Sequence, residues 1–554
     1  MILLYLEKII EKYKVLEIIS FLMISWGVYQ FALHSSIYSG DPEIHIIYAK
    51  NFINGHFLEF NPGYKTGGES SFLYFLIVSF LYKFLGIYTV FGMKLISIFS
   101  FLWISYQIYE INPSKTIPVK LIGSTLLSVI GLISTQVMLG MENIFFAAIL
   151  ITFLSKELKS ERRFENKGII FKTILLFLIR PEGLTYPFFL FIKSIFLKNK
   201  KLLLYSLISI LFCGISYYVL SIISGGNYHN AGSIRKYIST LEVSAVNNLN
   251  VDLLGYNLSL GINIFRSLIY TYPLIFGLIL FRKYLIRIDI IISINFIVLP
   301  LFLHFFNFIP NIQFSRYFLY SYCLIFLIFA ARILPNLSKV FIASLGILYL
   351  LLSIYSGVVH NHKFSFCNNN NYYNCVSHNQ LINTIKSTSP ENVKKYSDEI
   401  FKKLSKDDND IIDIGTVEVQ IRNRLDDRFR VWSLDGIVDR ELNKFKGKDF
   451  IDHFKYIEFR DIDYLADLPN LNRSKEYLSL NDFSTSLNKS TPSYCTIPAN
   501  INSVKGNECF LKTDEKLESN CIKNKKLIKT NVRSWHLNLG GWNGGWLWKV
   551  ESCN

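Results

Sequence analysis

Long apolar runs separated by short polar loops fill the chain up to about residue 358, where the sequence becomes rich in Asn, Lys, Asp and Ser. Runs of this length predict helices that cross a bilayer, and those that are short must extend into their flanks or bend. We therefore predict a transmembrane part, residues 1–358, and a soluble α/β domain, residues 359–554, large enough to bury its own core. The predicted spans are Val15–His34, Tyr88–Tyr109, Ile117–Gln136, Asn143–Ser155, Gly168–Ile179, Leu184–Leu197, Leu202–Ser224, Gly261–Phe281, Ile288–Phe306, Tyr317–Ala331 and Val340–Val358.

One further apolar run, Phe72–Ile87, decides the predicted topology. If this run does not cross, the basic loops at 156–167, 198–201 and 282–287 fall on the N-terminal, cytoplasmic side, as the positive-inside bias favours. If it crosses, the same loops fall outside. We therefore interpret it as a juxtamembrane or half-inserted helix. This predicts about 11 spans in the inner or plasma membrane, a cytoplasmic N-terminus and an extracytoplasmic soluble domain.

The composition agrees with a membrane protein and excludes some other classes. Of 554 residues, 51% are hydrophobic, which is too apolar for an ordinary soluble protein. The net charge of +16 resides largely in loops between spans, where it sets orientation, and no nucleic-acid-binding motif accompanies it. We therefore expect membrane lipid, and not nucleic acid, among the partners.

The eight cysteines divide by region. Cys213 and Cys323 lie in apolar runs and are predicted to be core residues. The other six lie in the polar part, and none forms a paired zinc-type spacing, which favours up to three disulfides in an oxidising compartment. Free thiols in a cytosolic domain are the alternative. The six are Cys367, Cys375, Cys495, Cys509, Cys521 and Cys553.

The loop after the first span, residues 35–71, carries the most distinctive chemistry. Asp41 followed by Pro42 is a helix-start pattern, with the acid at the N-cap and the proline at the first helical position. The segment Glu43–Asn54 then predicts a short amphipathic helix lying along a surface, too short and too polar to span. Asp41 has two interpretations: it caps this helix, or it is a general base at the mouth of the bundle.

Other ionisable residues fall in the predicted outward loops. They are Glu142, Arg180 with Glu182, and Arg316. Burying such groups beside lipid costs free energy, so a functional role is the first hypothesis for each. For any one of these residues the alternative is an ion pair at the membrane interface, or a side chain that extends to the interface to keep its charge in water. Their gathering on one side of the membrane favours a site.

A series of short motifs runs along the chain in order. They are GDPEI at 40–44, YAKNF at 48–52, GHF at 55–57, NPG at 61–63, GME at 140–142, RPEG at 180–183, RY at 316–317, DIG at 413–415 and LDGIVD at 434–439. In this order they resemble the GT-C superfamily of polyprenyl-phosphate-dependent glycosyltransferases, and in particular the branch with the terminal arabinofuranosyltransferases. The chain departs from that pattern in having Gly40 for a second acid, Glu43 for an aromatic and Glu69 for a small polar residue, which leaves the sugar and acceptor open.

This resemblance implies a membrane glycosyltransferase. It would transfer a sugar from a polyprenyl-phosphate donor to an extracytoplasmic glycan, lipid or protein acceptor. Such a transfer needs a base for the acceptor hydroxyl and cations or hydrogen-bond donors for the leaving phosphate. We assign Asp41 as the base, with Glu142 orienting it or binding sugar hydroxyls. Arg180 and Arg316 would hold the phosphate, to which a planar guanidinium is suited.

The matched motifs also place Glu182, Tyr48 and Asn61 among the substrate-binding residues. Lys65, in the Gly-rich loop, is a further candidate, with a solvated loop lysine as the alternative. No cofactor is expected. A divalent metal between Asp41 and Glu142 stays open but is not favoured.

Two other functions compete with a transferase. A transporter or flippase of lipid-linked sugars would commonly carry paired repeats with matching broken helices, and the sequence has no such repeat. A membrane-anchored glycan-binding protein would use only the soluble domain. It would not require acids and arginines to gather at the outer mouth of the bundle.

Overall fold

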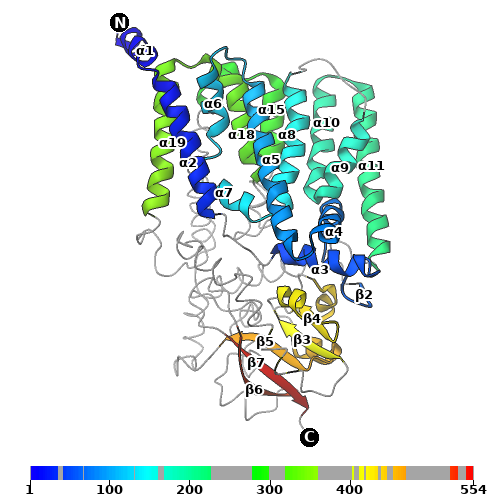
Figure 1. Cartoon of the computed structure of the whole chain (residues 1–554). Coiled ribbons are helices and arrows are strands. Elements are labelled where there is room, and N and C mark those ends of the chain that lie inside the picture. Colours follow the sequence, from blue (N-terminus) through cyan, green and yellow to red (C-terminus); the bar gives the residue numbers. More distant parts are fainter. Residues whose placement is uncertain are drawn as a thin grey trace, which may run out of the picture.

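The structure, a computed structural model, places helices side by side along one layer and a β-sheet beyond one end of them (Figure 1). It describes residues 2–34, 41–65, 68–129, 131–159, 168–225, 278–298, 319–359, 411–416, 419–433, 438–445, 453–469, 525–534 and 545–552, together with residues 398, 402 and 404.

The helices account for most of the predicted apolar runs. Within the described residues, four segments are long and apolar enough to cross a membrane: Val15–Ala32, Phe72–Ile111, Lys200–Ile223 and Leu319–Asn336. The principal helices are α1 Ile2–Lys12, α2 Val15–His34, α3 Asp41–Ile53, α4 Phe72–Leu85, α5 Thr89–Ile111, α6 Ile117–Thr125, α7 Gly131–Met138, α8 Glu142–Lys159, α9 Ile169–Ile179, α10 Thr185–Phe196, α11 Lys200–Ile223, α15 Arg287–Ser293, α18 Leu319–Ile328 and α19 Lys339–Val359.

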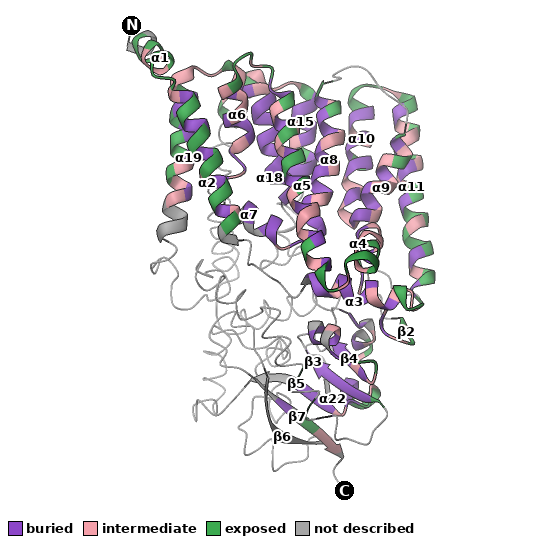
Figure 2. Ribbon diagram, in the orientation of Figure 1, coloured by how far each residue is buried: buried purple, intermediate pink, exposed green. Residues whose placement is uncertain are grey.

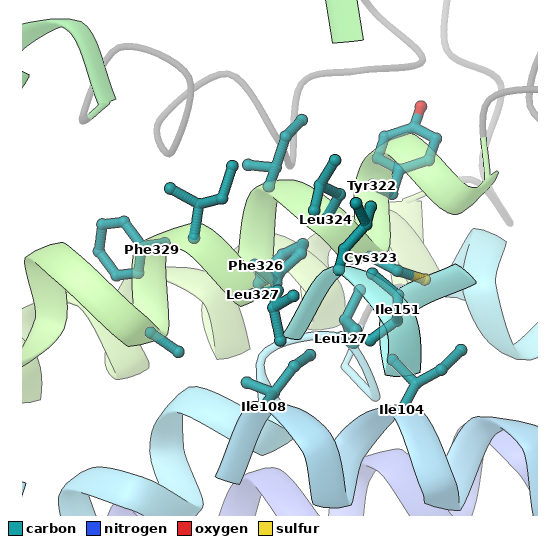
Figure 3. Close-up of a cluster of buried hydrophobic side chains, with 14 of the residues drawn as sticks. Ile104, Ile108, Leu127, Ile151, Tyr322, Cys323, Leu324, Phe326, Leu327 and Phe329 are labelled. Atoms are coloured by element: carbon teal, nitrogen blue, oxygen red, sulfur yellow. The ribbon is translucent and has the colours of Figure 1, made fainter. Parts of the chain in front are cut away.

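The main core lies where α5, α8 and α18 meet. Ile104, Ile151 and Phe326, one from each helix, belong to a single cluster of buried side chains (Figure 3). Cys213 and Cys323 are buried, as predicted for core residues. Large apolar side chains also cover the outside of α2, α5 and α11, where much of the surface is exposed (Figure 2). An apolar exterior of this extent is typical of a surface that contacts lipid, so the described helices fit a membrane protein.

The predicted span Ile117–Gln136 is not one continuous helix. The structure divides this run into α6 and α7, with a turn at residues 126–129 between them. The hydroxyls of Ser124 and Thr125 donate to the backbone carbonyl of Leu121 at 3.0 and 2.7 Å, and Ser128 donates to the carbonyl of Thr125 at 2.7 Å. Such local bonds compete with the regular helix and favour a bend or an end.

The run Phe72–Ile87 forms α4, which lies beside α3 near the end of the layer that faces the sheet (Figure 1). It ends at Gly86, whose φ of 53° lies in the left-handed region that glycine adopts without strain. The chain turns there through Gly86–Tyr88 and enters α5. An apolar stretch of 40 residues is thus two helices joined by a turn.

The polar part of the chain contains a mixed five-stranded sheet of order β4-β3-β5-β7-β6. Strand β3 pairs in parallel with β4 and β5, whereas β7 pairs antiparallel with β5 and β6. The strands are β3 Ile412–Thr416, β4 Phe429–Ser433, β5 Tyr464–Pro469, β6 Lys525–Ser534 and β7 Gly545–Ser552. A separate hairpin, β1 Glu59–Asn61 and β2 Tyr64–Lys65, follows α3.

The sheet does not bury its core alone. A single cluster of buried side chains contains Ile47 and Tyr48 of α3 and Phe60 of β1 together with Ile414 of β3 and Val431 of β4. The loop after the first span and the sheet therefore share one hydrophobic core. This shared core fixes α3 against the sheet and thereby positions the site.

Some predictions lie outside the described residues. These are the six cysteines of the polar part, Arg316, and most of the predicted span Gly261–Phe281. The disulfides stay a prediction.

Candidate functional site

The site is built around α3, which begins at Asp41 with Pro42 as its second residue. This agrees with the helix start predicted from the sequence. Residues 45–49 are all buried, so the helix does not present a polar face to solvent. Helix α3 lies between the ends of the membrane helices and the sheet (Figure 1). The predicted amphipathic pattern is wrong, because buried residues lie on both sides of the helix and no single apolar face is set apart from a polar one.

Two carboxylates flank His45 on α3. The Nδ1 atom of His45 lies 2.6 Å from Oε2 of Glu69, and its Nε2 atom lies 3.3 Å from Oε2 of Glu142. All three side chains are buried. The partners come from distant parts of the chain: Glu69 from the loop before α4, and Glu142 from the first position of α8. His45 therefore joins α3, the Gly-rich loop and α8.

The charge of His45 is set by these neighbours. Burial by itself lowers the pKa of His45, but the carboxylates of Glu69 and Glu142 outweigh it and raise the pKa to about 10. The imidazole is therefore protonated at neutral pH and donates from both ring nitrogens. The amide of Ser71 donates to the second oxygen of Glu69 at 2.8 Å, which orients that carboxylate.

Glu142 continues the network to Arg180. The guanidinium of Arg180 contacts Glu142 and the side-chain oxygen of Asn143 through NH1. Its Nε and NH2 atoms donate to the two oxygens of Glu182 at 3.1 and 2.8 Å, which is a bidentate pair. Burial raises the pKa of Glu182, but the Arg180 guanidinium outweighs it and lowers the pKa below its usual value. The structure thus brings Glu142 together with Arg180 and Glu182, which the sequence had placed in a separate loop.

The Arg-Pro-Glu-Gly turn has a steric reason to end in glycine. A Cβ atom added to Gly183 would lie 2.3 Å from the backbone carbon of Leu176 in α9. This is closer than any side chain tolerates, so only glycine lets the turn fold back against α9. The turn in this position carries Arg180 and Glu182 toward the start of α8.

The network contains three carboxylates and two cations. The carboxylates are those of Glu69, Glu142 and Glu182, and the cations are His45 and Arg180. Its net charge is one negative. The positive charge of Arg180 is therefore compensated by carboxylates, which makes it less suited to holding a phosphate by itself. Carboxylates accept hydrogen bonds, whereas the guanidinium and the amide nitrogen donate them. Such a set can bind hydroxyl groups, which both donate and accept.

Tyr48 and Asn61 lie on the sheet side of this network. The buried Tyr48 hydroxyl accepts a hydrogen bond from the amide of Gly68 at 2.9 Å, in the Gly-rich loop. The Asn61 side chain pairs with the backbone of Val431 in β4, donating at 2.8 Å and accepting at 2.9 Å. In this structure both residues hold the loop in place.

Lys65 and His56 lie nearer the surface. The Nζ atom of Lys65 donates to the carbonyl of Ile223 at 3.1 Å, at the last residue of α11. His56 lies 3.1 Å from Glu59, whose carboxylate also accepts from the amide of Gly63 at 2.6 Å. His56 thus supports the loop.

Sequence reasoning missed His45, and it noted Glu69 only as a departure from a pattern. The two lie 24 residues apart, and Glu142 lies a further 73 residues along the chain, so no local spacing relates them. A usable signal was the placement of His45 four residues after Asp41, which puts both on one side of a helix. Glu43 was likewise noted only as a departure.

Among the described residues, no group of three or more His, Cys, Asp or Glu side chains has an arrangement suited to a metal ion. The three acids of the network are engaged by His45 and Arg180.

No known protein-family model matches the chain, and no curated protein matches it.

Proposed function

We propose that this protein is an integral-membrane glycosyltransferase that transfers a sugar from a polyprenyl-phosphate donor to an extracytoplasmic acceptor. The observation that supports it is the buried network of Glu69, His45, Glu142, Arg180 and Glu182 beside the start of α3. Buried charges are costly, and when they gather at the end of a membrane bundle they favour a functional site over a structural one. The motif order along the chain points to the same chemistry.

The proposed topology has 11 spans, with the N-terminus in the cytoplasm and the sheet outside. The position of α4 beside α3 supports a helix that does not cross (Figure 1). Labelling of a cysteine introduced near residue 162 tests this proposal. Labelling from the exterior of intact cells would contradict it.

In the proposed reaction the acceptor hydroxyl attacks the anomeric carbon of the donor. Asp41 takes the hydroxyl proton as the new carbon–oxygen bond forms. The bond from the anomeric carbon to the phosphate oxygen breaks, and polyprenyl phosphate leaves with the electron pair. A positioned base of this kind contributes about 10²–10⁴ in rate.

We assign the charge network to the sugar of the donor. Its net negative charge disfavours a phosphate, whereas carboxylates beside an amide are complementary to hydroxyls. The side-chain nitrogen of Asn143 is buried and has no hydrogen-bond partner within the described part of the chain. A buried donor of this kind costs about 1–3 kcal/mol unless something accepts from it, and a sugar hydroxyl would do so. The phosphate is assigned to Arg316.

Two variants of Asp41 test the function. Asparagine caps a helix about as well as aspartate, so Asp41→Asn is expected to abolish transfer while folding stays intact. Asp41→Ala removes the helix cap as well, and it is expected to lower the free energy of unfolding by about 1 kcal/mol in addition. The measurement is transfer from a radiolabelled farnesyl-phosphoryl sugar by the purified full chain, with thermal unfolding alongside. Transfer by Asp41→Asn at the wild-type rate would leave Asp41 as a cap and refute the catalytic assignment.

A further inference from the structure

Helix α3 is held from two sides, and its two sides carry different polar contacts. On the bundle side, His45 contacts Glu142 of α8. On the sheet side, the side-chain nitrogen of Asn423 donates to Oε2 of Glu43. Asn423 belongs to the 3₁₀ segment η9, Val419–Arg424, between β3 and β4. Glu43 is two residues after Asp41 and only 1% exposed, so this contact lies at the start of the helix that carries the proposed base.

The sheet fastens the same loop in other ways. Asn61 makes two hydrogen bonds to the backbone of Val431, and Ile47 and Tyr48 pack into the core of the sheet. These contacts fix the middle of α3 and the hairpin after it. Of the polar contacts described here between this loop and the sheet region, that of Glu43 with Asn423 lies nearer to Asp41 in sequence than those of Asn61.

We propose that Glu43 and Asn423 are positioning residues for the transfer, through which the sheet holds the start of α3, and hence Asp41, in its working geometry. The inference rests on the proposed function. It makes the polar C-terminal part of the chain a component of the site. It also gives a reason for the acid at position 43, where the resembled glycosyltransferases carry an aromatic.

The pair allows an exchange of donor and acceptor. In Asn423→Asp two carboxylates face one another, and their repulsion separates η9 from the start of α3. In the double variant Glu43→Gln with Asn423→Asp, the new amide donates to the new carboxylate, and the hydrogen bond is restored with its direction reversed. Glu43→Gln alone places an amide opposite the amide of Asn423. The two amides can still form a hydrogen bond, so this variant is expected to have a small effect on kcat.

The first measurement is the kinetics of sugar transfer by the full chain. A misplacement of a catalytic group by about 1 Å costs about 10²-fold in rate, so Asn423→Asp is expected to lower kcat by about ten- to a hundredfold. The KM for the donor should change little, because neither residue belongs to the network assigned to the sugar. The double variant should recover most of the lost kcat. Asn54→Asp makes the same chemical change on an exposed side chain; it is the matched control and should leave kcat unchanged.

The second measurement does not depend on activity. Hydrogen exchange read by mass spectrometry should show faster exchange of the amides in residues 42–47 in Asn423→Asp, and wild-type protection in the double variant. If protection follows this pattern but no variant, wild type included, transfers sugar, the proposed function is wrong and the contact stands. If Asn423→Asp keeps both wild-type kcat and wild-type protection, or if the double variant restores neither, the positioning role is refuted.

Discussion

Replacing His45 with glutamine should remove a part of the stability that depends on pH. The protonated imidazole lies between Glu69 and Glu142, and its pKa is raised from 6.5 to about 10 by these carboxylates against the effect of burial. A pKa difference of that size between the folded and unfolded states corresponds to about 5 kcal/mol of folding free energy. Loss of one partner from a buried ion pair typically costs about 3–5 kcal/mol, because the remaining charge is left without compensation.

The sign of the pH dependence follows from the direction of the pKa. Because the folded state binds the proton more tightly than the unfolded chain, the stabilisation is complete below pH 6.5. It decreases as pH rises and is lost near pH 10. The wild-type protein should therefore lose stability between pH 7 and pH 10, and His45→Gln should lose less. The gap between their melting temperatures should narrow across this window.

The assay is thermal unfolding of the detergent-purified full chain at several pH values. His56→Gln is the matched control, because His56 also pairs with a glutamate but its side chain is 42% exposed. That variant should melt close to wild type at every pH. A gap for His45→Gln that stays constant from pH 7 to pH 10 would show that His45 does not carry the proton, and the account of the network would fail.

Two substitutions and one measurement test other parts of the protein. Arg180→Lys keeps the charge but cannot pair with both oxygens of Glu182, so transfer should fall by about tenfold or more, as read from initial rates; an unchanged rate would leave the bidentate pair without a role. Asn61→Ala leaves the backbone groups of Val431 unpaired and should cost about 1–3 kcal/mol, seen as a lower melting temperature than that of an Asn54→Ala control on an exposed side chain. Mass spectrometry of the unreduced protein should find the six cysteines of the polar part in disulfides, and six free thiols would contradict both the disulfides and the proposed topology.

The sequence by itself determined the local features of this protein. Apolar runs of sufficient length predicted most of the helices, and α2 has the predicted bounds Val15–His34. The Asp-Pro pair predicted the start of α3 because capping and the fixed φ of proline act within a few residues. Glu142, Arg180 and Glu182 were chosen because they are ionisable groups in short turns between apolar runs.

The tertiary structure decided which of these residues meet. His45 pairs with carboxylates 24 and 97 residues away, and no periodicity along the chain encodes such distances. The break between α6 and α7 depends on hydroxyls that bond locally, a choice that hydropathy does not register. Helix α3 was expected along a surface because its polar residues and its length do not suit a span. Those residues are buried because the bundle and the sheet each supply partners, and only the folded chain brings both to the same helix.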